Sequence, residues 1–340
     1  MYRGVYQKSL TLSGVRHGYH ISRVSSDRVW ISDNKGNLIL TNTKGEELDR
    51  VTNIGSVVWG GHTVDSNGDL IYIDRELNIS KLSTEDRVKT TIIKYNTTPW
   101  RPQCVYSSPS TGDLLVGMYR GDTRTGQVVR YNSTGENIQT VQNNNITGQE
   151  LYRDPIYITE NRNGDVIVSD ISRVVVTDRE GNYRFSYRGP PSGSRLTPQG
   201  ICTDALSHIL VCDLYTQSVQ MLDSEGHYLT EIKTSQHGID NPISLSYDED
   251  THLLWVGTWN NNTVNIYRVV DTDSLTGVPL EDIKCKKHPR IPLDQFCTPC
   301  GVPLCVECTS SEDHSRHDLR KIKTLFDNIH EIEGMSLNLL

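Results

Sequence analysis

Eight cysteine and histidine residues in the C-terminal part of the sequence have the spacing of metal ligands. They are Cys285, His288, Cys297, Cys300, Cys305, Cys308, His314 and His317. They form four pairs, and the two residues between the members of each pair allow a short turn to direct both side chains at one ion. Two tetrahedral zinc ions require eight ligands, so the set predicts two zinc ions. Because the protein supplies every ligand, no position remains for water, and we expect structural rather than hydrolytic zinc.

Disulfide bonds are the alternative explanation of these cysteines. Five cysteines would leave one without a partner, and the three histidines at ligand spacing would have no role. The pattern therefore favours zinc. Structural zinc contributes on the order of 10–16 kcal/mol to the folding of small modules with little core of their own. We expect a chelator to unfold this module.

The residues after the last predicted ligand have the spacing of a helical seam. Leu319, Ile322, Phe326 and Ile329 follow one another at alternating steps of three and four residues, which predicts a helix over residues 319–340. The run is too short to hold a coiled-coil dimer alone, and Gly334 interrupts it. Two interpretations stay open: the start of a coiled coil, or a single helix packed on the zinc module.

A larger unit precedes the zinc module, and its sequence repeats. An apolar, mostly β-branched strand recurs six times, and the copies end at Asp33, Asp74, Gly117, Asp170, Asp213 and Gly257. The ends lie 41 to 53 residues apart, in the range of four-stranded propeller blades. Turns such as Asn163-Gly164-Asp165 supply positive φ, while the strands between them favour a pleated backbone. The sequence predicts an all-β, six-bladed β-propeller over residues 1–272, a linker over 273–284 and the zinc module over 285–318.

The sixth copy has no outer strand after its third one, whereas residues 9–12 form an apolar-alternating segment with no place in the first blade. We therefore expect residues 9–12 to pair with residues 264–269. This pairing would close the ring and remove an open sheet edge that invites aggregation.

The strand order divides the loops between two faces of the propeller. Turns between first and second strands, and between third and fourth strands, carry most of the Asp and Glu residues and form an acidic face. The opposite face, here called the arginine face, is formed by the blade-to-blade crossings and the second-to-third turns. Arginine and aromatic residues anchor many interfaces, so we predict partner contacts there by Trp59, Trp100, Arg101, Tyr119, Tyr152, Arg153 and Arg188. Packing between blades is the alternative role of Trp59 and Trp100.

Both units resemble known families. The zinc module resembles a B-box of the second type along its whole length, and the resemblance implies cross-braced ions. One ion would take Cys285, His288, Cys305 and Cys308, and the other Cys297, Cys300, His314 and His317. The repeats resemble the NHL-repeat propellers of tripartite-motif proteins through their Gly-Asp or Gly-Asn turns, β-branched strands and terminal Asp. In that family the B-box precedes the propeller, which is the reverse of the order in this chain.

The resemblance implies a zinc-binding interaction scaffold or adaptor that recruits substrates for ubiquitin ligation, with self-association through the B-box and helix. Ligase activity in the family comes chiefly from a RING, and this sequence has no RING-like set of cysteines to which that role transfers. One alternative is single-stranded RNA binding by the arginine face. A second is a lactonase-type enzyme whose channel metal would be held by inward carboxylates. For the repeated Asp33, Asp74, Asp170 and Asp213, capping of turns is the simpler explanation.

The charge balance limits the classes of partner. The formal net charge is -8, and residues 1–280 hold 26 Lys and Arg against 32 Asp and Glu, which disfavours a DNA-binding protein. RNA remains compatible because the acids gather on the other face. No window reaches the ~18 consecutive apolar residues of a membrane helix, and residues 1–15 lack the apolar stretch of a signal peptide. We expect a cytoplasmic protein with protein partners and no membrane contact.

Overall fold

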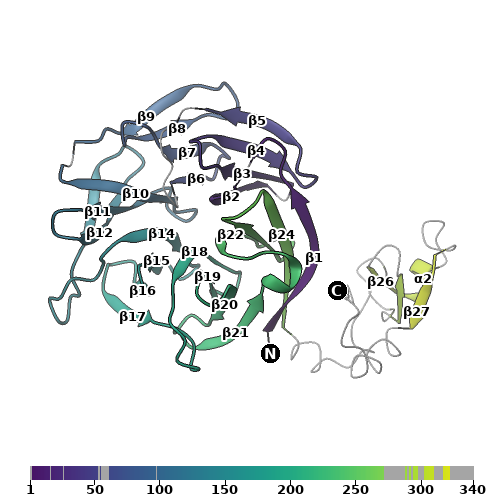
Figure 1. Cartoon of the computed structure of the whole chain (residues 1–340). Coiled ribbons are helices and arrows are strands. Elements are labelled where there is room, and N and C mark those ends of the chain that lie inside the picture. Colours follow the sequence, from purple (N-terminus) through teal and green to yellow (C-terminus); the bar gives the residue numbers. More distant parts are fainter. Residues whose placement is uncertain are drawn as a thin grey trace. The chain divides into compact units, whose positions relative to one another are not determined.

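The computed structural model describes most of the propeller and parts of the zinc module. The described residues are 2–15, 17–25, 27–52, 54, 61–96, 98–271, 288, 291, 294–297, 302–309 and 317–321. Within them, six four-stranded antiparallel sheets form a β-propeller, and one three-stranded sheet belongs to the zinc module. Figure 1 shows the six blades arranged around a common centre. The all-β propeller expected from the sequence is confirmed.

In blades 1 to 3 the four strands follow one another both in the sequence and in the sheet. The strands are β2 (His20–Ser25), β3 (Arg28–Ser32), β4 (Leu38–Asn42) and β5 (Glu47–Val51); β6 (His62–Val64), β7 (Leu70–Ile73), β8 (Ile79–Leu82) and β9 (Lys89–Ile93); and β10 (Trp100–Ser107), β11 (Leu114–Arg120), β12 (Thr125–Tyr131) and β13 (Asn137–Val141). The first strand of each blade lies nearest the centre of the ring (Figure 1).

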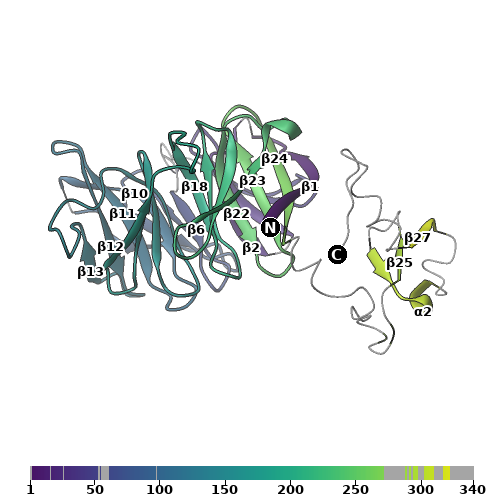
Figure 2. The ribbon, with the colours of Figure 1, turned by 90° about the horizontal axis from the view of Figure 1, so that it is seen from below.

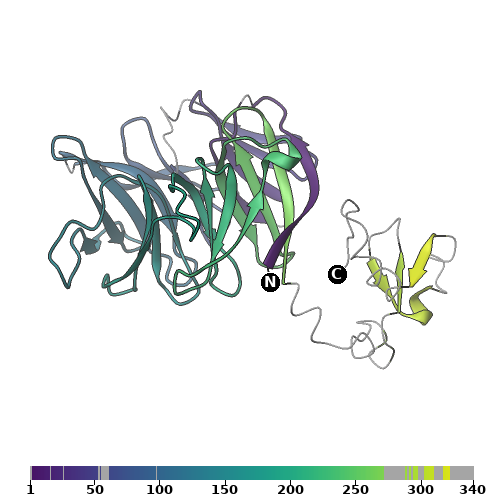
Figure 3. The ribbon, with the colours of Figure 1, turned by 60° about the horizontal axis from the view of Figure 1, so that its bottom comes forward.

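Blades 4 and 5 repeat this order, and blade 6 takes its outer strand from the N-terminus. The strands are β14 (Pro155–Glu160), β15 (Val166–Asp170), β16 (Arg173–Thr177) and β17 (Tyr183–Tyr187); β18 (Pro198–Thr203), β19 (Ile209–Asp213), β20 (Ser218–Leu222) and β21 (Tyr228–Lys233); and β22 (Pro242–Asp248), β23 (Leu253–Thr258), β24 (Thr263–Asp271) and β1 (Tyr2–Thr11), with the short helix η1 (Ser235–His237) before blade 6. Figures 2 and 3 show the blades from the side, with turns gathered at both ends of the strands.

Turn chemistry ends the strands where the sequence indicated. Between β14 and β15, the Asn161 side-chain oxygen accepts hydrogen bonds from the backbone N–H groups of Asn163 and Asp165, both at 2.9 Å. Gly164 adopts φ 82° in this turn, a left-handed conformation that glycine reaches without the clash a Cβ would cause. The chain therefore reverses within a few residues and starts β15.

Each blade is buried on both sides because it packs between two neighbours. In β15 all five residues are buried. Val166 and Val168 pack with residues of blade 3, including Leu115, whereas Ile167 points the other way and packs with residues of blade 5, including Ile201. Because successive side chains of a strand point to opposite faces, a continuous apolar run supplies both interfaces.

The ring closes through strand β1, which pairs with β24 as the outer strand of blade 6. The backbone N–H of Leu12 donates to the Asn262 carbonyl oxygen at 2.8 Å, and the Asn262 side-chain amide donates to the Leu12 carbonyl oxygen at 3.0 Å. The closure expected from the sequence is confirmed, with a longer strand than residues 9–12. The added length follows from pairing with β24, which supplies hydrogen-bond partners along its own extension.

The centre of the propeller is crossed by a side chain. Tyr157, from the inner strand of blade 4, donates its hydroxyl hydrogen bond to the carbonyl oxygen of Tyr19, which directly precedes blade 1. Their oxygen atoms lie 2.8 Å apart. Beside this bridge the rings of His20 and His62 lie 4.4 Å apart, and the Nε2–H of His62 donates to the His20 carbonyl oxygen. The bridge links opposite blades of the ring.

The described part of the zinc module is a small sheet with one helical turn. Strands β25 (Gln295–Cys297), β26 (Val302–Leu304) and β27 (Leu319–Lys321) have the order β26-β25-β27, and α2 (Val306–Thr309) follows β26. The predicted helix does not begin at Leu319, because Leu319 pairs with Cys297 in the sheet and packs on the module core. Residues 322–340 lie outside the described residues. None of the described helices is long and apolar enough to span a membrane.

Candidate zinc centre and partner-binding face

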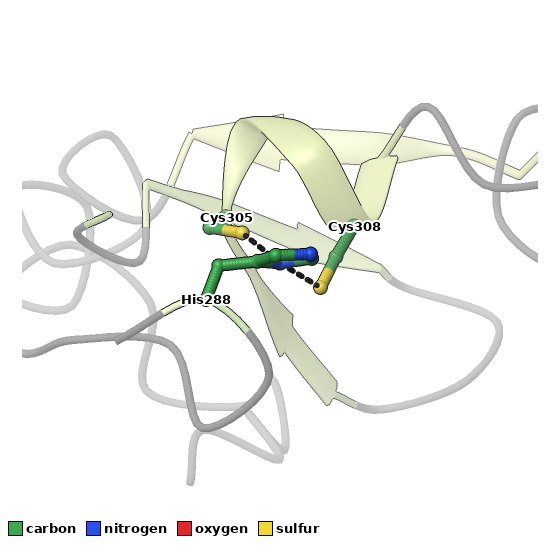
Figure 4. Close-up of side chains that lie close together, drawn as sticks. All are labelled: His288, Cys305 and Cys308. Carbon is green, nitrogen blue, oxygen red and sulfur yellow. Dashed lines mark hydrogen bonds between the residues drawn. The ribbon is translucent and has the colours of Figure 1, made fainter. Parts of the chain in front are cut away.

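Three predicted ligands come together at the end of the small sheet. His288 Nδ1 lies 3.3 Å from the Cys305 sulfur and 3.4 Å from the Cys308 sulfur, and all three ligand atoms lie within 4.8 Å of one another. Figure 4 shows the imidazole of His288 pointing between the two thiols. Cys305 directly precedes α2 and Cys308 lies within it, so one helical turn places both sulfur atoms on the same side.

The geometry of this cluster fits zinc. Tetrahedral zinc with Zn–S of about 2.3 Å and Zn–N of about 2.05 Å separates a sulfur from a nitrogen ligand by about 3.5 Å, close to the two distances found. Cys305 and Cys308 are buried, so an ion bound by them would be shielded from solvent. Sulfur and imidazole are also the ligand types that structural zinc prefers.

A carboxylate contacts the ring nitrogen of His288 that faces away from the cysteine sulfur atoms. The Glu307 carboxylate lies 3.3 Å from His288 Nε2, while Nδ1 faces the sulfur atoms. A histidine that donates one N–H to a carboxylate presents the lone pair of its other nitrogen to a metal. Glu307 therefore favours the tautomer and ring orientation that a zinc ligand needs.

A second pair of predicted ligands also comes together in the module. The Cys297 sulfur lies 3.3 Å from His317 Nδ1, because Cys297 ends β25 and His317 comes just before β27, its neighbouring strand. The three other predicted ligands, Cys285, Cys300 and His314, lie outside the described residues. No disulfide joins the cysteines that the structure describes.

The recurring aspartates at the strand ends bind backbone groups of turns. Asp170 accepts from the backbone N–H groups of Arg153, at 3.0 Å, and Asp154. Asp213 accepts from those of Thr197, at 2.8 Å, and Tyr215. Asp33 and Asp74 accept from N–H groups of their own following turns. These carboxylates cap turns, which was the simpler explanation given for the repeated aspartates. They are not aimed at a common metal.

The predicted partner residues differ in their exposure. Arg101, Arg153 and Arg188 are exposed, and Trp100 and Tyr119 are partly buried. Tyr152 is 0% exposed because it packs between blades 3 and 4 beside Cys104 and Ile158. It therefore belongs to the core, which corrects the expectation for this residue. Trp59 lies outside the described residues.

Arginines on the two faces differ in their ion pairs. On the acidic face, Arg23 pairs with Asp248 at 2.5 Å, Arg184 with Asp165 at 2.5 Å, and Arg162 with Glu249. On the arginine face, the exposed arginines that make no ion pair with any described carboxylate are Arg75, Arg101, Arg124, Arg153, Arg188 and Arg195. Arg120 and Arg173 do make ion pairs there, with Asp122 at 2.7 Å and with Asp170 at 3.3 Å. The arginine face thus carries several arginines without an ion pair among the described residues, together with the exposed acids Glu150 and Asp240.

Three exposed apolar residues on the arginine face were not anticipated. Ile171, Tyr215 and Trp259 are exposed, and each lies in the second-to-third turn of its blade. The signal in the sequence is positional: each one follows, by one or two residues, the polar residue that ends the second strand. They line the same face as the unpaired arginines.

Comparison with known proteins identifies the zinc module and the propeller fold. The family model for the B-box zinc finger matches residues 280–322. No curated protein matches the sequence.

Solved structures similar to this chain include three bacterial propellers. A gluconolactonase from Xanthomonas campestris has a TM-score of 0.60 at 13% identity, covering 79% of this chain and 95% of that one. Virginiamycin B lyase from Staphylococcus aureus has a TM-score of 0.54 at 12% identity, covering 79% and 100%. A Bacteroides caccae protein of unknown function has a TM-score of 0.54 at 14% identity, covering 74% and 87%. At these identities the likeness shows the fold alone. The chain therefore combines a six-bladed β-propeller with a C-terminal B-box zinc finger.

Proposed function

We propose that this protein is an interaction scaffold that binds a protein partner on the arginine face of its propeller. The observation that carries the proposal is the contrast between the two faces. On the acidic face Arg23, Arg162 and Arg184 pair with carboxylates and Arg179 is exposed without a described ion pair, whereas on the arginine face Arg101, Arg153 and Arg188 are all exposed without a described ion pair. An exposed guanidinium group offers several N–H donors in a fixed plane and gains most when a partner supplies a carboxylate.

The zinc module supplies assembly in this proposal. We propose two structural zinc ions, one held by His288, Cys305 and Cys308 with Cys285, and the other by Cys297 and His317 with Cys300 and His314. Filled sites would fold the module and leave no position for catalytic water. The module and the residues after it would mediate self-association. In ubiquitin ligation we assign the protein the role of a substrate-recruiting adaptor of the tripartite-motif type, acting in the cytoplasm.

Single-stranded RNA is the second candidate ligand of the arginine face. The exposed arginines beside Tyr119 support it, because guanidinium groups contact phosphates and aromatic rings stack on bases. The net negative charge of the propeller disfavours it. The recurring aspartates cap turns and so do not favour the lactonase alternative.

Charge reversal separates these functions. The full chain would be used as bait, in wild-type form, as Arg101→Glu/Arg153→Glu, and as the control Arg179→Glu, which makes the same change at an exposed residue of the acidic face. Protein partners that survive nuclease and are lost only with the double substitution support the scaffold. Loss of all captured material on nuclease treatment would favour RNA, and capture that is equal for all three baits contradicts binding at this face.

A further inference from the structure

The arginine face of blades 4, 5 and 6 carries an arc of exposed apolar side chains. Ile171, Tyr215 and Trp259 are 49%, 61% and 37% exposed, and they occupy the equivalent turn of three successive blades. In blades 1 to 3 the corresponding turns begin with Asn34, Arg75 and Gly121. Among these six second-to-third turns, exposed large apolar side chains are therefore found in those of blades 4 to 6.

Hydrogen bonds hold each of these turns against the crossing that enters the same blade. Asp170 precedes Ile171 and binds the N–H of Arg153, and Asp213 binds the N–H groups of both Thr197 and Tyr215. In blade 6 the N–H of Trp259 donates directly to a carbonyl oxygen of the crossing, that of Asn241, at 3.2 Å. The turns that carry the apolar residues are thus fixed against the crossings, one of which carries Arg153, before any partner binds.

Trp259 is supported further by aromatic residues that lead into blade 1. Its ring lies 5.3 Å from that of Tyr19, and the His17 Nδ1–H donates to its carbonyl oxygen at 2.7 Å. A large side chain that is already restricted in the free protein loses less conformational entropy on binding. Tryptophan and tyrosine are also the residue types most often found to dominate interface energy.

Positive charge flanks the part of the arc in blades 4 and 5, whereas the crossing into blade 6 carries the exposed Asp240. Arg153, Arg188 and Arg195 lie on the crossings into blades 4 and 5, and each is exposed without an ion pair among the described residues. Apolar side chains next to unpaired guanidinium groups match a ligand that offers apolar side chains and carboxylates together. Single-stranded RNA matches less well, because the aliphatic Ile171 offers neither stacking nor hydrogen bonds to a base.

We propose that the arc of Ile171, Tyr215 and Trp259, with Arg153, Arg188 and Arg195, is the docking surface for an acidic polypeptide segment that carries aromatic or aliphatic side chains. This inference rests on the proposed scaffold function and narrows it to one half of the arginine face and one class of partner. The apolar side chains of the segment cover the arc, while its carboxylates pair with the arginines.

Labelled peptides test the proposal on the zinc-loaded full chain. The probe is a pool of fluorescent 12-residue peptides in which Asp or Glu alternates with Phe, Leu, Ile or Tyr, and the matched pool has Asn and Gln in place of the acids. Anisotropy titrations would compare wild type with Ile171→Ser/Tyr215→Ser, Arg153→Glu/Arg188→Glu and Arg179→Glu. Circular dichroism would verify that each variant is folded, and the chosen side chains are exposed, so folding should persist.

We expect the acidic pool to bind wild type and Arg179→Glu equally and to bind each double variant at least tenfold more weakly. Absence of binding by the acidic pool, or equal binding of the amide pool, overturns the inference. If only the arginine variant loses binding, the apolar arc is not the site, although a scaffold acting through the arginine face would stand. Preferential binding of a 12-nucleotide oligouridine over the acidic pool overturns both proposals.

Discussion

Mild acid should destabilise the propeller through the histidine pair at its centre. His62 is 0% exposed, and burial lowers its pKa from 6.5 to about 3. Burial, and secondly the neighbouring His62, also lower the pKa of His20. Both rings are therefore neutral in the folded protein at pH 7, and His62 uses its one N–H to bind the His20 carbonyl oxygen.

The lowered pKa of His62 determines in which direction stability changes with pH. Below pH 6.5 the unfolded chain takes up a proton on His62, while the folded protein does so only near pH 3. The stability that the folded protein derives from neutral His62 is therefore fully present above pH 6.5 and is lost as the pH falls toward 3. At pH 5 the unfolded state gains about 2 kcal/mol from His62 alone, by the relation of 1.36 kcal/mol per pKa unit. His20 changes stability in the same direction.

Urea unfolding followed by tryptophan fluorescence at pH 7 and pH 5 measures this loss. We expect the wild-type free energy of unfolding to fall by about 2 kcal/mol or more. A His62→Gln variant lacks the titrating group, so its loss over the same interval should be smaller than the wild-type loss by about 2 kcal/mol, whatever its stability at pH 7. Equal losses in the two proteins would refute the claim that His62 is buried in neutral form.

The remaining predictions concern the zinc module and the loop caps. A chelator should release zinc and abolish the folded signals of residues 288–321 in NMR spectra while the propeller signals persist; unchanged spectra after complete zinc removal would contradict a zinc-dependent fold. Replacing Glu307 by Gln should weaken zinc binding about tenfold in competition with a chromophoric chelator, because His288 loses its charged orienting partner, whereas Glu312→Gln serves as the control. Asp170→Ala should lower the free energy of unfolding by about 2–3 kcal/mol and increase proteolysis near residue 153, since two backbone N–H groups lose their acceptor.

The propeller ring could be predicted because the same sequence pattern occurs once in each blade. Each blade needs turns with positive φ and apolar strands that face two neighbours, and these demands recur in the sequence at nearly fixed intervals. The missing outer strand of blade 6 and the spare segment near the N-terminus then specified the closure that β1 and β24 make. The zinc module could also be predicted, because zinc coordination restricts both the types of the ligand residues and their spacing.

Features that depend on long-range packing could not be predicted from the sequence. Leu319 has helical spacing to the apolar residues after it, but pairing with Cys297 places it in a strand, and local periodicity contains no information on that partner. Tyr152 and Arg153 are neighbours in one loop, yet Tyr152 fills the contact between blades while Arg153 is exposed. The bridge from Tyr157 to Tyr19 spans the ring, so only the closed fold brings its two ends together.

Partner binding by the arginine face is tested most directly by the affinity of a captured protein partner for single charge-reversal variants of the full chain. Isothermal titration calorimetry at two salt concentrations would compare wild type, Arg153→Glu and Arg179→Glu. We predict that Arg153→Glu weakens binding at least tenfold, that Arg179→Glu leaves it unchanged, and that salt weakens wild-type binding more than binding by Arg153→Glu. Equal affinities of Arg153→Glu and wild type at both salt concentrations would contradict partner binding by the arginine face.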